Sequence, residues 1–141
     1  MTTFDQAAAT TLLQTAFAKW VQDLDLTIER VDSNGAVLRM KFSERLCRDN
    51  GVVCGQALMS LADTAMVFAF SAAASGYLPM TTVDQTMHFL KPASKTDLLA
   101  EARVLRMGRT MGFGNVEICP VNDTKPVAVA QTAYALLREG K

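Results

Sequence analysis

The first stretch of the chain, residues 1–24, has apolar residues that recur every three or four positions. They are Phe4, Ala8, Leu12, Leu13, Ala16, Phe17, Trp20, Val21 and Leu24. This spacing follows the 3.6-residue turn of a helix and puts the apolar side chains on one face. The pattern therefore predicts an amphipathic N-terminal helix over residues 1–24.

After this helix the hydrophobic period changes from about four residues to two. Residues 26–31 and 36–42 alternate between apolar and polar side chains, and Asp-Ser-Asn-Gly at 32–35 separates them. Alternation is typical of half-buried strands, and the Asn-Gly dipeptide is typical of a tight hairpin turn. These residues predict a β-hairpin.

A second helical segment, residues 57–75, is apolar on nearly all sides. Its length would suffice to cross a membrane. However, it contains Asp63, whose insertion at the bilayer centre costs roughly 2.5 to 3.5 kcal/mol, and its many Ala and Ser residues provide little hydrophobic driving force. A buried core helix has the same composition. We therefore predict a central helix over 57–75, ended by Gly76 and Pro79.

Four further segments have the character of strands, and turn residues separate them. They are residues 81–90, 97–106, 113–119 and 127–137. The order of helix, hairpin, apolar helix and consecutive strands predicts an α+β fold in which one antiparallel sheet curls around the central helix. A chain of 141 residues that is 50% hydrophobic forms one domain, over residues 1–141, with an ordinary core.

Charge and cysteine content narrow the classes of partner and compartment. Lys plus Arg and Asp plus Glu each number 14, and the basic residues form no dense tract, so we expect no nucleic-acid partner. This charge composition is compatible with a small anionic ligand. The three cysteines fit neither a metal knuckle nor a disulfide framework. The N-terminal residues have no basic region before an apolar run, so we expect a cytoplasmic protein.

The run at 54–65 holds the clearest candidate chemistry. Asp63 is the single carboxylate of this apolar stretch, and it follows Gly55, whose backbone N–H a ligand can approach closely. A carboxylate in apolar surroundings costs several kcal/mol unless it is paired or partly hydrated, so its presence points to a reactive site. The alternative is a structural aspartate at a subunit contact, with Ser60 or Thr64 as its hydrogen-bonding neighbour.

Several motifs in the second half of the chain occur together. Cys-Gly-Gln at 54–56 leads into Leu-Ala-Asp-Thr-Ala at 61–65, and further motifs follow at 82–84, 89–93 and 102–109. In this combination the chain resembles the hotdog-fold acyl-CoA thioesterases of the phenylacetate-degradation (PaaI-like) type, which typically have His-Gly-Gly at the first motif. The resemblance extends over about residues 50–137.

This resemblance implies roles for three residues. Asp63 matches the catalytic acid, which acts as a nucleophile on the thioester carbonyl or as a general base for water. The backbone N–H of Gly55 matches the oxyanion donor at a helix N-terminus. Thr82 matches a hydroxyl that positions water. In that family Gly55 of one subunit faces Asp63 of another, which implies a homo-oligomer, either a dimer or a dimer of dimers.

The resemblance also implies the ligands. Coenzyme A is part of the substrate, so no separate cofactor is expected. One histidine and scattered cysteines do not suit a metal site, and Asp63 in the apolar helix argues against a membrane. Lys91, Arg106 and Arg109 lie at predicted strand ends where relatives bind the phosphates of coenzyme A, and cationic side chains suit phosphate oxygens. For each of the three, a solvated surface charge is the alternative.

The chain departs from the family motif at three positions. Cys54 replaces the histidine, and a thiol cannot form the strong hydrogen bonds of an imidazole. Gln56 replaces the second glycine, and we predict that its amide substitutes in the site. Arg48 occupies a position where relatives often have Asn or Gln to orient water. Either Asn50, two residues later, takes that role after a loop shift, or the role is lost.

Three alternatives to a thioesterase remain. Cys54 at a helix N-terminus could be a nucleophile, but His88, the only histidine, lies in a predicted strand and nothing places it nearby. A hydratase or dehydratase uses a histidine with an acid, which this motif lacks. A non-catalytic acyl-CoA-binding module is the third. The prediction is an acyl-CoA thioesterase for small or medium acyl groups, including aryl and arylacetyl groups.

Overall fold

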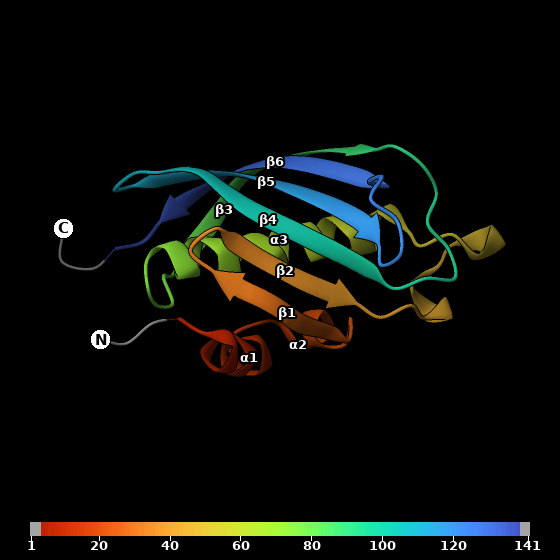
Figure 1. Ribbon diagram of the computed structural model, residues 1–141, viewed down its shortest axis with the longest axis horizontal. Helices are drawn as coiled ribbons and strands as arrows, with labels where there is room; N and C mark the ends of the chain where they lie inside the picture. The colour runs from red at the N-terminus through yellow and green to blue at the C-terminus, as the bar shows by residue number, and fades with distance from the viewer. Residues whose placement is uncertain (1–3, 139–141) are drawn as a thin grey trace.

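The computed structural model describes residues 4–138 and contains one antiparallel sheet of six strands. The strands are β1 Leu26–Asp32, β2 Gly35–Met40, β3 Met80–Phe89, β4 Leu98–Met107, β5 Met111–Pro120 and β6 Ala128–Leu136. Their order in the sheet is β1-β2-β4-β5-β6-β3, and every neighbouring pair is antiparallel. The sheet curls around helix α3, Gly55–Ala73 (Figure 1). The predicted α+β architecture is confirmed.

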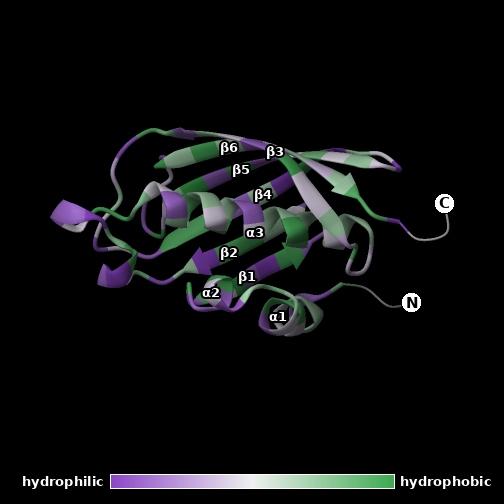
Figure 2. Cartoon of the chain, turned by 180° about the vertical axis from the view of Figure 1, so that it is seen from behind, coloured by the Kyte–Doolittle hydropathy of each residue, from purple (hydrophilic) through white to green (hydrophobic). Residues whose placement is uncertain are grey.

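Helix α3 is the core of the molecule. It is long and apolar enough to cross a membrane, but 61% of its most apolar 18-residue stretch is buried inside the structure. Seen from behind, it lies along the concave side of the sheet (Figure 2). Its end is closed by Ser75, which has a left-handed φ of 61°, and by Gly76, whose N–H donates to the carbonyl of Ser71 at 2.9 Å.

The predicted N-terminal helix over 1–24 is wrong in one respect, because the structure has two helices there. They are α1, Gln6–Thr15, and α2, Lys19–Gln22. Residues 1–3 of the predicted helix lie outside the described residues. Ala18 has extended backbone angles (φ −55°, ψ 148°), which interrupt the helical path between α1 and α2.

A tertiary contact explains the interruption. The ring of Phe17 stacks on Phe68 of α3, with ring centroids 5.6 Å apart. The break changes the helical phase, so Trp20, which the pattern puts on the apolar face, is 61% exposed. Packing against α3 therefore outweighs the continuous helix that the periodicity predicts.

The hairpin between β1 and β2 forms where the Asn-Gly dipeptide predicts it. Asp32 accepts a hydrogen bond from the N–H of Asn34 at 2.8 Å and pairs with Gly35 in the ladder. Gly35 has a φ of 142°, and a Cβ there would lie 2.0 Å from the carbonyl oxygen of Ala102 on β4. Only glycine permits this close approach of the hairpin to the next strand.

The two edges of the sheet differ. At the β1 edge, helix α1 packs alongside, and Gln6 donates its side-chain N–H to the carbonyl of Ile28 at 2.7 Å. At the other edge, β6 is the only strand that pairs with β3 within residues 4–138. Exposed apolar side chains, among them Val83, Phe89 and Leu90, lie in and just after β3. An open edge strand with exposed apolar side chains is a template for pairing with another chain.

Candidate active site

Asp63 lies on the one stripe of α3 that the sheet leaves partly exposed. The stripe includes Gln56, Met59, Ser60, Asp63 and Val67, at steps of three and four residues. It runs beside β3, because Gln85 on that strand donates its side-chain N–H to the carbonyl of Met59 at 3.1 Å. The carboxylate is therefore held between the core helix and the open edge strand.

Two hydroxyl groups bind the same oxygen of this carboxylate. Thr82 on β3 donates to Asp63 Oδ1 at 2.7 Å, and the hydroxyl of Tyr134 on β6 also donates to Oδ1. Thr82 and Tyr134 are direct partners in the β3–β6 ladder, so their side chains point to the same face. A bulge at Val83 immediately follows, and bulges often adjust side chains next to active sites.

Tyr134 is a buried phenol with a fixed ring. The ring packs edge-on against Phe70 of α3, with centroids 5.2 Å apart, and the hydroxyl lies 2.9 Å from the backbone carbonyl oxygen of Asp63. Burial, and then the negative charge of Asp63, raise the pKa of Tyr134 well above its ordinary value. The hydroxyl therefore remains protonated and donates throughout the ordinary pH range.

Tyr134 is not among the site residues predicted from the sequence. The sequence did contain one indication: a tyrosine occupies an inward-facing position of the alternating strand predicted over 127–137. A buried tyrosine hydroxyl needs a hydrogen-bond partner, which is a reason to look for a polar group opposite it. The partner is Asp63, 71 residues away in the chain, so only the fold reveals the pair.

Gly55 is the first residue of α3 and lines a second feature of the site, the Gly55 hollow. This hollow has a volume of about 420 Å³. Its walls include Leu58 and Phe89, and it also takes in Arg48 and Lys91. A Cβ on Gly55 would lie 3.3 Å from the ring of Phe89, so glycine keeps the backbone open to a ligand. Apolar walls and two cations suit an apolar group attached to an anionic one.

Gly55 and Asp63 of one chain are not close neighbours. They are separated by eight positions of a continuous helix, which corresponds to about 12 Å along its axis. An N–H at the helix start and a carboxylate two turns later cannot both contact one carbonyl group.

The three residues proposed as substitutes in the family motif lie in different places. Cys54 is the half-buried N-cap of α3, and its backbone N–H donates to Leu46 at 2.9 Å. Gln56 is exposed on the first turn of the helix. Asn50 is exposed in a short turn with a left-handed φ of 65°. Arg48, rather than Asn50, lines the Gly55 hollow.

The three candidate phosphate-binding cations are not brought together within one chain. Lys91 lies at the Gly55 hollow, where it forms an ion pair with Asp123 at 3.5 Å. Arg106 and Arg109 lie at the other end of the sheet, at the β4–β5 turn. That turn is beside the start of β3, because Met111 and Met80 pair with adjacent residues of β6.

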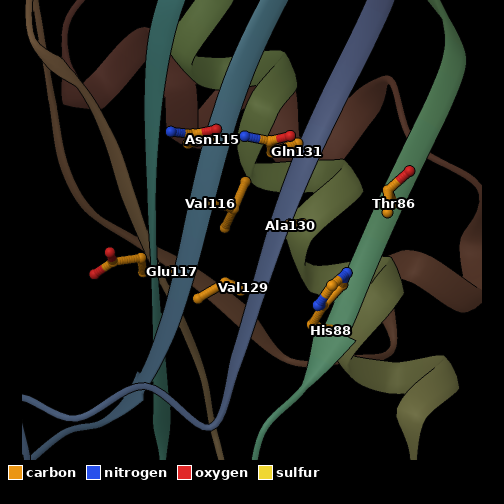
Figure 3. A pocket seen from close by; sticks show the side chains of 8 residues that line it. All are labelled: Thr86, His88, Asn115, Val116, Glu117, Val129, Ala130 and Gln131. Carbon is orange, nitrogen blue, oxygen red and sulfur yellow. The ribbon is translucent and has the colours of Figure 1, made fainter.

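His88 is exposed on the outer face of the sheet. There it lines a shallow hollow with Thr86, Glu117 and Gln131 (Figure 3). The next residue, Phe89, contacts Gly55, and successive side chains of a strand point to opposite faces. His88 therefore points away from the helix start, and no dyad with Cys54 forms. Among residues 4–138, no group of three or more His, Cys, Asp or Glu side chains could hold a metal ion.

Comparisons with known proteins identify relatives of this fold. Residues 50–127 match the thioesterase superfamily. A Halobacterium salinarum protein named as an esterase is 28% identical, over 99% of each chain. Zebrafish thioesterase superfamily member 2 superposes with a TM-score of 0.84 at 20% identity, covering 94% of this chain and 99% of that one.

Two bacterial structures are similarly close. A Haemophilus influenzae thioesterase has a TM-score of 0.86 at 19% identity, covering 99% of this chain and 94% of that one. The Escherichia coli PaaI protein from the phenylacetic acid degradation operon has a TM-score of 0.80 at 24% identity, covering 94% of each chain. At these identities the superpositions show a shared fold, and the predicted hotdog fold is confirmed.

Proposed function

This chain belongs to the thioesterase superfamily and is a thioester hydrolase, and from this premise we propose that it hydrolyses small or medium acyl-CoA esters. The observation that carries the proposal is the Asp63 carboxylate. It lies in an apolar helix, beside an open sheet edge, with two hydroxyl donors on one oxygen. A carboxylate held in this way is suited to act on a carbonyl group or on water.

Asp63 serves the reaction by either of two routes with the same products. As a general base it takes a proton from water, whose oxygen adds to the thioester carbonyl carbon. As a nucleophile it forms a mixed anhydride that water then hydrolyses. In both routes the carbon–sulfur bond breaks, coenzyme A leaves as a thiolate that takes up a proton, and the free acid forms. The Thr82 hydroxyl donates to Asp63 and can still accept a hydrogen bond from that water.

The tetrahedral intermediate carries an oxyanion, for which we propose the backbone N–H of Gly55 as donor. This N–H belongs to the first turn of α3, where it has no acceptor within the helix and where the helix dipole favours negative charge. The approximately 12 Å between Gly55 and Asp63 along one helix supports a site in which the donor comes from a partner subunit.

The open edge at β3 supports the same arrangement. If two β3 strands pair antiparallel about their midpoints, the Met80 end of each lies beside the Phe89 end of the other. Thr82 and Asp63 are at the first end, and Phe89 contacts Gly55 at the second. Two such sites per dimer follow from the twofold symmetry, and dimers can associate further into tetramers.

The same pairing joins the candidate binding residues. It brings Lys91, which follows β3, toward the end of the sheet where the partner has Arg106 and Arg109. We propose that these cations bind the phosphates of coenzyme A, while the Gly55 hollow accepts an apolar part of the substrate. Cys54 and Gln56, which flank Gly55 in the chain, replace the positioning groups of the family motif.

Aryl and arylacetyl groups are the substrate classes that we propose within this range. The Phe89 ring and the apolar walls of the Gly55 hollow support them, since aromatic side chains pack well against aromatic ligands. The likeness to the PaaI protein of the phenylacetic acid degradation operon adds support at the level of the fold. The three free cysteines support our proposal of a cytoplasmic enzyme.

The test is release of free thiol from a panel of aryl-, arylacetyl- and straight-chain acyl-CoA esters. We expect turnover of at least one ester, and Asp63→Asn should lower it by about 10²- to 10⁴-fold while acyl-CoA still binds. Glu117→Gln is the matched control, because Glu117 is an exposed carboxylate on the outer face of the sheet, away from the Gly55 hollow. The thiol background of the three cysteines is subtracted with enzyme alone.

Failure of the whole panel would contradict the proposal. If every ester binds and none is cleaved, the non-catalytic acyl-CoA-binding module becomes the better description. If an ester is cleaved equally by the wild type and by Asp63→Asn, the chain is a hydrolase with another acid.

A further inference from the structure

We propose that Tyr134 is a positioning residue that holds Asp63 Oδ1, so that Oδ2 is the oxygen that reacts. This inference rests on the proposed function of Asp63. It concerns which atom acts and which residue selects it.

The two carboxylate oxygens of Asp63 differ in their hydrogen bonds. Oδ1 accepts from both Thr82 and Tyr134, whereas no donor within residues 4–138 binds Oδ2. An ionised carboxylate oxygen has about two lone-pair positions, so the two hydroxyls fill those of Oδ1. Oδ2 is left free for a water proton or a carbonyl carbon.

Tyr134 is the more rigid of the two donors. Its side chain is 1% exposed, and its strand β6 lies between β5 and β3. The ring contacts Phe70, and the hydroxyl also reaches the backbone oxygen of Asp63, so the phenol is tied to the helix at two points. Both contacts fix the position of the hydroxyl relative to the carboxylate.

Thr82 differs because it is exposed on the edge strand. Its hydroxyl can exchange hydrogen bonds with water or substrate during turnover, whereas Tyr134 has no such freedom. The two residues therefore divide the work. Tyr134 keeps the carboxylate oriented, and Thr82 connects it to the water.

Tyr134→Phe tests this role because it removes one hydroxyl and leaves the ring packing in place. We expect kcat to fall by about 10- to 100-fold, the loss typical of a hydrogen bond to a charged group, with KM for the acyl-CoA changed less than about threefold.

Tyr77→Phe is the matched control. Tyr77 is the only other tyrosine and is half exposed, so its hydroxyl should not affect kcat. A Tyr134→Phe enzyme that melts at a lower temperature but keeps the wild-type kcat would overturn the proposal and leave a structural role. Full turnover by Asp63→Asn would instead overturn the proposed function.

A second measurement uses folded protein with Tyr134 intact. In the Tyr77→Phe background, 3-fluorotyrosine labels Tyr134 alone, so one ¹⁹F resonance reports its hydroxyl. We expect Asp63→Asn to shift this resonance, because the Tyr134 hydroxyl then loses its anionic acceptor. A resonance that Asp63→Asn leaves unchanged would contradict the contact.

Discussion

At the scale of single residues, Gly55 allows a backbone atom to be tested by substitution. It is the first residue of α3, a position where proline is well tolerated, and Cys54 before it already has the extended angles (φ −72°, ψ 154°) that a residue before proline adopts. Gly55→Pro therefore removes the proposed oxyanion donor and keeps the helix. We expect a loss of about 10²- to 10³-fold in kcat with a nearly unchanged melting temperature.

Gly55→Ala is the control for the volume of the new side chain. It keeps the N–H but adds a Cβ 3.3 Å from the Phe89 ring, which can yield because Phe89 is half exposed. A proline variant much slower than the alanine variant identifies the N–H as the active group. Equal losses would assign the effect to crowding, and an active proline variant would exclude Gly55 as donor.

How far the site could be predicted differs from residue to residue. Asp63 stood out because a lone carboxylate in an apolar helix needs a reason, and Thr82 was chosen through the family resemblance. Their hydrogen bond depends on the pairing of β3 with the helix, which no local pattern contains. Tyr134 belongs to no motif, and its partner is 71 residues away.

At the scale of elements, Asp97 joins strands β2 and β4. Its carboxylate accepts from the N–H of Phe42 at 2.8 Å and from Arg39 at 2.7 Å. The Phe42 N–H and then Arg39 lower the pKa of Asp97. A lowered pKa in the folded state stabilises the fold above the unfolded pKa, near 4, and the gain is lost as pH falls through the folded value.

Asp97→Asn should therefore lower the melting temperature at pH 7 by about 2 to 4 °C, a modest loss because both partners are partly exposed. The difference from the wild type should shrink as pH falls below about 4 and through the lowered pKa of Asp97. Melting curves across pH check this. Asp49→Asn is the control. The Asp49 side chain is 83% exposed, so this variant should melt at the wild-type temperature at every pH. A difference in melting temperature between Asp97→Asn and the wild type that stays constant with pH would mean that Asp97 acts through packing.

The elements themselves were largely predictable. Strands alternate between buried and exposed side chains, so their period of two located β3, β4, β5 and β6 to within about two residues at each end. The N-terminal helix was not predictable as two pieces. Its break at Ala18 allows Phe17 to stack on Phe68, and that contact is between residues far apart in sequence.

At the scale of the whole molecule, one edge of the sheet is covered and the other is open. Helix α1 protects β1, whereas β3 presents ten residues of edge with exposed Val83 and Phe89. The sequence suggested an oligomer only through family resemblance, because the hydrophobic pattern of β3 does not say which strand becomes an edge. The strand order supplies the missing reason for placing a partner there.

A shared site can be tested by mixing two inactive chains. Asp63→Asn lacks the acid, and Gly55→Pro lacks the donor, so each alone should be nearly inactive. If the site takes Asp63 from one chain and Gly55 from its partner, a mixed dimer contains one site with both groups intact. Random re-association of equal amounts should then restore about a quarter of the wild-type activity, because half the dimers are mixed and each has one working site of two.

Thiol release after unfolding and refolding the mixture measures the restored activity, and the separately refolded variants are the controls. A mixture no more active than its components would contradict a shared site, because sites built within one chain cannot be repaired by exchange of subunits.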